Sequence, residues 1–264
     1  MDKQISLNEA VNLVETGSSL ALGGMTLYRR PFAFIKQLLR RHKKFEQPNS
    51  LTLIAFTASF ESDLLVGAGL ISKVHTCYFG FEIFGLAPMF TYLANRREID
   101  VIEESEASLS FGLRAQLAGV GFMPGLGWIG TDMLAIRPDV KTITDPYSGE
   151  ELVAFPAIRP DIAVIHALKA DPAGNAIIGN NKAVDEDLVG ASRIVVITAE
   201  EIVPELEKAD IVAPYVHAVI HTPLGALPSS CHPIYPVDGK AIMDYIENVS
   251  NPASFQSFLR EYLQ

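Results

Sequence analysis

Short, continuous runs of apolar and mostly β-branched residues recur along this chain of 264 residues. The clearest runs cover 161–166, 193–198 and 216–221, and others are found at 19–22, 51–56, 74–81 and 120–123. A strand that is apolar on both faces is typical of a parallel sheet covered by helices, because neither face meets water. These runs constrain the fold more than any other feature of the sequence.

Helical patterns lie between the apolar runs. Ser6 and Glu9 form a capping box, and Pro31 is placed to open a second helix, where its missing N–H is no loss. Further helices are expected at 63–70, 88–97 and 105–117, and in two pieces over 239–263 that break near Pro252. Strands that alternate with helices predict an α/β fold with an open, mostly parallel sheet and helices on both faces. Residues 138–151 are loop-like, and without a clear linker we expect a single domain over residues 1–264.

The charge balance limits the possible partners. With 31 acidic and 21 basic residues the net charge is -10, so no basic excess exists to displace counterions from nucleic acid, and no nucleic-acid partner is expected. No apolar run reaches the roughly 18 residues that a membrane span needs, and the first residues lack the layout of a secretory signal. Cys77 and Cys231 have no companion thiol nearby, so neither a disulfide scaffold nor a metal site is expected. These observations favour a cytoplasmic protein without membrane association.

A glycine pair follows the strand expected at 19–22. Gly23, Gly24 and Met25 could bring backbone N–H groups close to a carbonyl oxygen or a phosphate, and ligands gather at the carboxyl ends of parallel strands. Arg29 and Arg30 follow and could hold a carboxylate or phosphate. The alternatives are a tight turn without a ligand and two solvated surface charges.

Acidic residues gather where the helix expected at 105–117 begins: Glu103, Glu104 and Glu106. Carboxylates in a first turn interact favourably with the helix dipole, which is a sufficient structural reason for them. Like-charge repulsion also raises the pKa of at least one acid in such a cluster, which suits a general base near neutral pH. The sequence leaves both interpretations open.

A glycine-rich segment, 125–132, contains Trp128, the single tryptophan. Its glycine spacing fits neither a dinucleotide fingerprint nor a P-loop. One interpretation is a mobile loop whose tryptophan covers an acyl chain, and the other is a surface loop around a buried tryptophan. His166 and His221 end apolar strands and are expected to be satisfied core histidines, and no Gly-x-Ser-x-Gly elbow of a serine hydrolase is found.

Several segments together resemble the A (alpha) subunit of glutaconate CoA-transferase and its relatives in the class I CoA-transferase family. Residues 21–31, Ala-Leu-Gly-Gly-Met-Thr-Leu-Tyr-Arg-Arg-Pro, are similar to the family's Ala-Leu-Gly-Gly-Phe followed by a basic pair and proline. Further similar segments lie, in the family's order, at 121–124, 145–147, 153–156, 161–167, 171–175 and 225–231. The resemblance covers nearly the whole chain.

The resemblance implies a three-layer α/β fold and an obligate homologous B (beta) subunit, in an α2β2 or larger assembly. The catalytic glutamate of these transferases belongs to that partner, in a Ser-Glu-Asn-Gly-like motif that this chain lacks. On this resemblance the substrates are coenzyme A thioesters and carboxylic acids, and no cofactor is permanently bound. Gly23, Gly24 and the N–H of Met25 would steady the oxyanion, Arg29 would face a distal substrate carboxylate, and Trp128 would border the acyl group.

Related heteromeric proteins carry out other reactions on CoA esters. In steroid ring-opening hydrolases the A subunit itself carries a catalytic glutamate, whose position Glu106 matches, whereas Glu103 matches an acid found more widely in the family. The alternative function is therefore a subunit of a β-ketoacyl-CoA C–C hydrolase or an acyl-CoA decarboxylase that uses Glu106 as general base. A third possibility is a non-catalytic subunit that only supports its partner.

Overall fold

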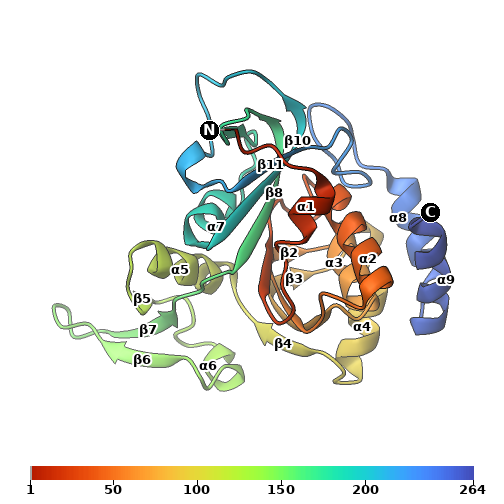
Figure 1. Cartoon of the computed structure of the whole chain (residues 1–264). Helices are drawn as coiled ribbons and strands as arrows, with labels where there is room; N and C mark the ends of the chain where they lie inside the picture. Colours follow the sequence, from red (N-terminus) through yellow and green to blue (C-terminus); the bar gives the residue numbers. More distant parts are fainter. Residues whose placement is uncertain (1) are drawn as a thin grey trace.

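The computed structural model describes residues 2–264, and a parallel sheet forms its centre (Figure 1). Seven strands lie in the order β11-β10-β8-β1-β2-β3-β4, and each neighbouring pair is parallel. Their bounds are β1 Ser19–Leu22, β2 Leu51–Ala58, β3 Ile71–Phe79, β4 Asp100–Glu103, β8 Ile162–Ala170, β10 Ile194–Ile202 and β11 Ala218–His221. The short β9 (Ala176–Ile177) pairs antiparallel with β8. The predicted open, mostly parallel sheet is confirmed.

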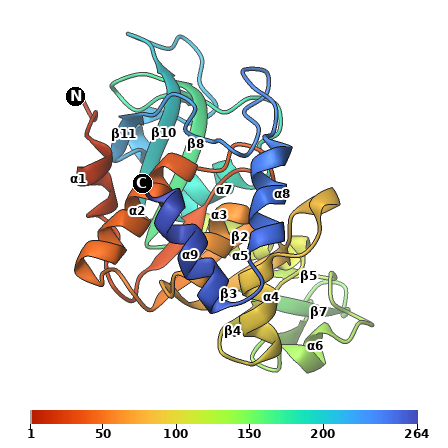
Figure 2. The same ribbon diagram turned by 90° about the vertical axis from the view of Figure 1, so that its right-hand side faces the viewer.

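Helices cover both faces of this sheet and enclose two separate apolar cores. One core contains α1 Leu7–Val11, α2 Phe32–Phe45, α3 Phe60–Gly67, α4 Pro88–Asn95, α8 Gly239–Asn248 and α9 Pro252–Tyr262. The other contains α5 Glu106–Leu117 and α7 Asp185–Ala191. Leu20 and Leu22 of β1 point into the first core and Ala21 into the second, which explains why the strands are apolar throughout. Figure 2 shows α2, α8 and α9 together on one side of the strands.

The helix starts follow the expected local signals. Ser6 and Glu9 form the predicted capping box of α1, and Pro31 is the N-cap of α2. Pro252 opens α9 where the break in the last helical stretch was expected. Two short 3-10 helices, Glu82–Phe84 and Ala213–Tyr215, complete the helical elements of the described residues. None of the helices in residues 2–264 is long and apolar enough to cross a bilayer.

A small antiparallel sheet projects from the main body, at the lower left of Figure 1. It consists of β5 Phe122–Gly125, β7 Glu151–Pro156 and β6 Lys141–Thr144, in the order β5-β7-β6, and α6 Met133–Ile136 lies beside it. Its own core contains Trp128, Val140, Val153 and Phe155. The expectation of a plain loop at 138–151 was therefore wrong at 141–144, which form β6, and at Glu151, where β7 begins. Because β6 is only four residues long and mostly exposed, its sequence carries little apolar alternation.

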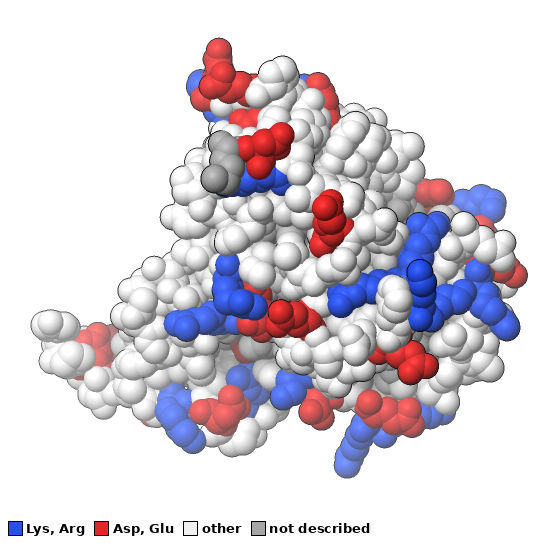
Figure 3. All heavy atoms as spheres, viewed as in Figure 1, with Lys and Arg blue, Asp and Glu red and all other residues white. Residues whose placement is uncertain are grey.

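Charged side chains are mixed on the face of the molecule drawn in Figure 3, where Lys and Arg are interspersed with Asp and Glu. Large areas of that face carry neither sign of charge. This face therefore offers no continuous basic track of the kind that follows a phosphate backbone.

Candidate active site

The glycine loop follows β1, the strand at which the strand order reverses. From β1 the chain adds β2, β3 and β4 on one side, and the later strands β8, β10 and β11 lie on the other side. Such a switch point is where open α/β sheets bind ligands, at the carboxyl ends of the strands. The structure thus places Gly23 and Gly24 at the edge where a site was expected.

The loop's N–H groups already have acceptors inside the chain. Gly23 donates to the Val164 carbonyl at 3.0 Å, Gly24 donates to Asp185 Oδ1 at 2.9 Å, and Met25 donates to the Tyr28 carbonyl at 2.9 Å. Gly24 has φ +81°, and a Cβ there would lie 2.5 Å from the Tyr28 carbonyl oxygen, so only glycine fits. An oxyanion could take these donors only in exchange for their present acceptors, which differs from the preformed oxyanion loop expected from the sequence.

Arg29 and Arg30 are both fully buried, and each forms an ion pair with a buried acid. Arg29 Nη2 lies 2.9 Å from Asp185 Oδ2, and its guanidinium also donates to the carbonyls of His166 and Asn181. Arg30 Nη2 lies 2.6 Å from Glu61 Oε1. Because Arg29 is paired with Asp185 and no part of it reaches solvent, its position gives no support to the expectation that it faces a substrate carboxylate. The surface-charge alternative is wrong.

A cavity of about 550 Å³ opens beside this loop, at the carboxyl end of β8. It is lined by Tyr28, Leu168, Gly179, Asn180, Asn181, His232 and Pro233. The lining offers neutral hydrogen-bonding groups together with apolar surface, and its volume falls in the usual range for small-molecule sites. The cavity is therefore the concave feature that best fits the switch point.

The second candidate region is the turn between β4 and α5. Glu103 is the last residue of β4, Ser105 is the N-cap of α5 and accepts a hydrogen bond from the N–H of Ser108, and Glu106 is the first helical residue. Glu103 and Glu106 are exposed. The sequence placed all the acids at the start of a helix, but Glu103 ends a strand that the sequence did not reveal.

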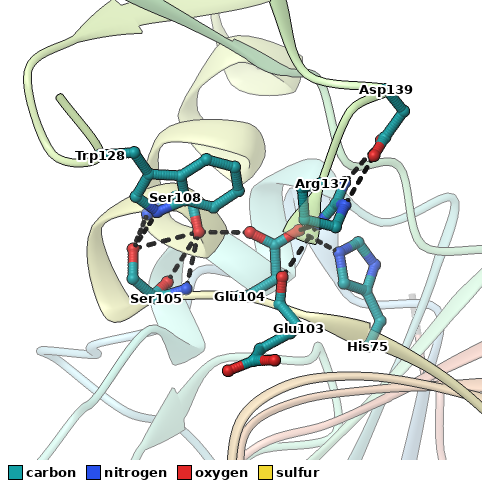
Figure 4. A network of polar contacts seen from close by, with 8 residues as sticks. All are labelled: His75, Glu103, Glu104, Ser105, Ser108, Trp128, Arg137 and Asp139. Atoms are coloured by element: carbon teal, nitrogen blue, oxygen red, sulfur yellow. Dashed lines mark hydrogen bonds and ion pairs between the residues drawn. The ribbon is translucent and has the colours of Figure 1, made fainter. Parts of the chain in front are cut away.

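Glu104, between those two exposed acids, points inward and is the centre of a polar network (Figure 4). Its carboxylate lies 2.5 Å from His75 Nε2 and 2.7 Å from Arg137 Nη1, and it accepts a short hydrogen bond from the Ser108 hydroxyl. Burial alone would raise the pKa of Glu104, but the hydrogen bonds and charge of His75, with Ser108 and Arg137, outweigh it and lower the pKa. Glu104 is thus held as a carboxylate.

Trp128 is buried against this turn and does not line an open pocket. It is 1% exposed, its ring packs edge-on against Phe155 at 5.1 Å, and its Nε1–H donates to Ser105 Oγ at 2.9 Å. Of the two interpretations from the sequence, the buried tryptophan is confirmed. An indole fixed in this way cannot cover an acyl chain without leaving its core.

His166 belongs to a buried network at the ends of β8 and β10. Its Nε2 lies 2.8 Å from Glu200 Oε1, and Glu200 also accepts hydrogen bonds from the Tyr235 hydroxyl and the Leu224 N–H. The expected satisfied core histidine is confirmed for His166 but is wrong for His221, which is exposed.

Three possible metal ligands meet in this network, because donor atoms of His166, Glu200 and Cys231 lie within 4.8 Å of one another. They come from three distant segments, so their spacing in the sequence gave no signal. Burial, together with the charge of Glu200, raises the pKa of Cys231 to about 12, which disfavours the thiolate that a metal needs. The positions of His166 and Glu200 are accounted for by their own hydrogen bond and by those that Glu200 accepts from Tyr235 and Leu224.

The two candidate regions both lie at the carboxyl ends of the strands, but they follow strands that are not neighbours in the sheet. Three strand steps separate β1 from β4 in the sheet order, which corresponds to about 14 Å at the usual strand spacing. The glycine loop and the Glu103–Glu106 turn are therefore two separate parts of the same edge.

The family model described as coenzyme A transferase matches residues 4–220. The chain belongs to the coenzyme A transferase family.

The A subunit of 3-oxoadipate CoA-transferase from Pseudomonas knackmussii is 30% identical to this chain, and the alignment covers 100% of this chain and 94% of that protein. The cholesterol ring-cleaving hydrolase IpdA subunit of Rhodococcus jostii is also 30% identical, over 99% and 92%. A longer protein of Archaeoglobus fulgidus is 32% identical, and this chain spans 99% of its own length but only 59% of that relative's.

Solved structures with a similar fold agree with this. Glutaconate coenzyme A-transferase from Acidaminococcus fermentans superposes with a TM-score of 0.91 at 27% identity, covering 99% of this chain and 88% of that one. A variant of the decarboxylase AibA/AibB superposes with a TM-score of 0.87 at 26% identity, covering 98% and 100%. The fold implied by the sequence resemblance is therefore confirmed, and the proteins to which this chain is similar are named for different reactions.

Proposed function

We propose that this chain is the A subunit of a heteromeric CoA-transferase that moves CoA between carboxylic acids. The observation that carries the proposal is the alignment over nearly the full length of both chains with proteins named as the A subunits of such transferases. The structure agrees with a divided active site, because the arginines and N–H groups of the central loop are engaged inside the chain. On this proposal a homologous B subunit supplies the attacking glutamate.

The reaction needs only acyl-CoA and a free acid, with no permanently bound cofactor. The partner's glutamate attacks the thioester carbonyl, the CoA thiolate leaves, and an acyl–glutamyl anhydride forms. The thiolate then attacks the glutamyl carbonyl and releases the first acid, which leaves a glutamyl-CoA thioester for the second acid. This chain's share is one wall of the cleft, the cavity beside Tyr28 and Asn181 at the end of β8. Since Arg29 is buried, any cation that binds a distal carboxylate comes from another residue.

The test is co-expression with the candidate partner, followed by incubation with a panel of acyl-CoA esters and free acids. We expect CoA exchange that requires both chains, and a glutamyl-CoA thioester that borohydride reduces in the partner. Exchange without the partner, or turnover without a trapped thioester, contradicts covalent transfer through the partner's glutamate. The mass of the purified complex measures whether the assembly is α2β2 or larger, and localisation in cells tests the cytoplasmic assignment.

A second function, hydrolysis or decarboxylation of a CoA ester, is favoured by the position of Glu106. Its carboxylate is exposed at the first residue of α5, on the same sheet edge as the cavity, and is free to act on water or on a carbon acid. The relatives named as a decarboxylase and as part of a ring-cleaving hydrolase give this alternative its reaction classes.

Replacement of Glu106 separates the two functions. If Glu106 is the general base, Glu106→Gln lowers kcat by ~10²–10⁴-fold without loss of the complex. Glu15→Gln is the matched control, because Glu15 is exposed near the opposite edge of the sheet, before β1. If Glu106→Gln and Glu15→Gln both turn over like the wild type, the hydrolase and decarboxylase mechanisms through Glu106 are excluded.

A further inference from the structure

We propose that Glu104 is a positioning residue for Glu106, through which the small antiparallel sheet sets the direction of the Glu106 carboxylate. The inference rests on the second function proposed above, in which the Glu106 carboxylate reacts, and it assumes that the β4–α5 turn borders the cleft in which acyl-CoA reacts. It rests on the contacts that converge on this turn from three separate parts of the chain.

The first support is that the buried carboxylate of Glu104 is held from both sheets. His75, which holds it from one side, is on β3 of the main sheet. Arg137 comes from the segment after α6, beside the small sheet, and holds it from the other side. A carboxylate that is 8% exposed and bonded to both of these groups has little freedom to move.

The second support is that the same contacts reach the residues on either side of Glu104. Arg137 Nη1 also donates to the Glu103 carbonyl at 3.0 Å, and Trp128 donates to the Ser105 hydroxyl at 2.9 Å. Ser105 is the N-cap of α5, so its position fixes where the helix begins and where Glu106 projects. Figure 4 shows these side chains converging on the turn.

The third support is the number of polar contacts that meet at a short turn. Asp139 orients the other edge of the Arg137 guanidinium at 2.8 Å, and the Trp128 ring centroid lies 5.8 Å from that guanidinium. A surface turn that only joins a strand to a helix needs none of these groups. Precise placement of a reacting carboxylate does need them, because small displacements of a catalytic group lower the rate strongly.

The inference also predicts a pH dependence. The charged and titratable groups that face Glu104 are His75 and Cys77 from β3, and Arg137 from the small-sheet side, while Ser108 faces it from α5. Arg137→Gln removes one of the groups that lower the pKa of Glu104, whereas burial still raises it. Glu104 then becomes protonated at a higher pH and releases its hold on the turn. The acid limb of the plot of kcat against pH should therefore move to higher pH in Arg137→Gln. Arg137→Lys keeps the positive charge and should move the acid limb less.

The decisive experiment is a double-mutant cycle in the complex with the partner chain. Glu104→Gln is expected to lower kcat by ~10-fold or more while KM for acyl-CoA changes by less than about twofold. The double variant Glu104→Gln/Glu106→Gln should be no slower than Glu106→Gln alone, because a positioning residue has no effect once its target is gone. Arg114→Gln, at the far end of α5, is the control and should leave kcat, KM and the pH profile unchanged.

Three outcomes overturn the inference. If Glu104→Gln retains the wild-type kcat, or if its loss adds fully to that of Glu106→Gln, Glu104 does not act through Glu106. If the wild-type complex is active and Glu106→Gln is equally active, no carboxylate is being positioned, although CoA transfer through the partner stands. A wild-type complex that is inactive on every acyl-CoA overturns the proposed function, and this inference falls with it.

Discussion

The two turns at the carboxyl edge of the sheet use their charges in opposite ways. In the glycine loop after β1, both arginines are buried in ion pairs, and the backbone N–H groups of the loop donate to acceptors within the chain. In the turn after β4, one acid is buried among hydrogen-bond donors while its neighbours Glu103 and Glu106 remain exposed. The arginines and the N–H donors of the first turn are thus engaged within the chain. Of the acids in the second turn only Glu104 is engaged in this way, and the carboxylates on either side of it are exposed.

This difference bears on which turn can present a side chain to a ligand. The glycine loop has the clearer motif in the sequence, but its N–H donors and its arginines are already bonded within the chain. The acidic turn has no motif of comparable clarity, yet its exposed acids lie on a turn held by hydrogen bonds from Arg137 and Trp128. A reactive group needs both exposure and support, and within residues 2–264 the β4–α5 turn combines them.

The largest expected effect tests whether the glycine loop is a structural clamp. Asp185→Ala leaves Arg29 buried without its ionic partner and removes the acceptor of the Gly24 N–H. Loss of one partner from a buried pair destabilises a protein by about 3–5 kcal/mol. We expect a loss of this size in the free energy of unfolding, measured by urea denaturation of the purified chain. A change below about 1 kcal/mol would mean that the loop can rearrange, which would reopen its N–H groups to an oxyanion.

A smaller, pH-dependent effect comes from Asp63, a buried acid that differs from Glu104 in having no cationic partner among its hydrogen bonds. It accepts from the N–H groups of Met89 and Phe90 and from the Tyr245 hydroxyl. Burial raises its pKa from 3.8 to about 6. Since the folded chain then binds the proton more tightly than the unfolded chain, the free energy of unfolding falls as pH rises toward and through 6.

Asp63→Asn removes this dependence. Between pH 5 and 7 the wild type should lose ~1 kcal/mol more stability than Asp63→Asn, as measured by denaturation at a series of pH values. His166 acts in the opposite direction over the same window, because burial lowers its pKa and the unfolded chain takes up the proton first. The difference between the two proteins, rather than either curve alone, is therefore the measurement. Parallel curves would show that Asp63 is ionised throughout, like Glu104.

The sequence predicted the main sheet well because its signal is strong. Buried parallel strands are apolar on both faces, and the helices carry clear starts such as the Ser6–Glu9 capping box and Pro252. Four strands were missed: β4, β6, β7 and β9. The first two have four residues each with mostly exposed side chains, and β9 has only two residues. At an edge, a strand can be polar because one of its sides meets solvent, and it then resembles a loop.

The candidate site was less predictable, because burial and pairing of charges depend on contacts between distant segments. Asp185 meets Arg29 across 156 positions of the chain, and Arg137 meets Glu104 across 33. Nothing in the local pattern distinguishes Glu104, which is buried, from Glu103 and Glu106, which are exposed. The family resemblance singled out Glu106, and only the structure revealed the groups that support the turn before it.

The smallest expected effect concerns an exposed ion pair on the same helix as Glu106. Arg114 Nε lies 3.0 Å from Asp187 Oδ2 and joins α5 to α7, but the Arg114 side chain is 57% exposed. Solvent screens such a pair, so Arg114→Gln should lower the free energy of unfolding by less than about 1 kcal/mol, and added salt should reduce even this difference. The same denaturation measurements as for Asp185→Ala, at low and high salt, provide the check. A loss as large as that of Asp185→Ala would break the contrast between the two turns, because it would show that α5 depends on its exposed far end and not on the buried network at Glu104.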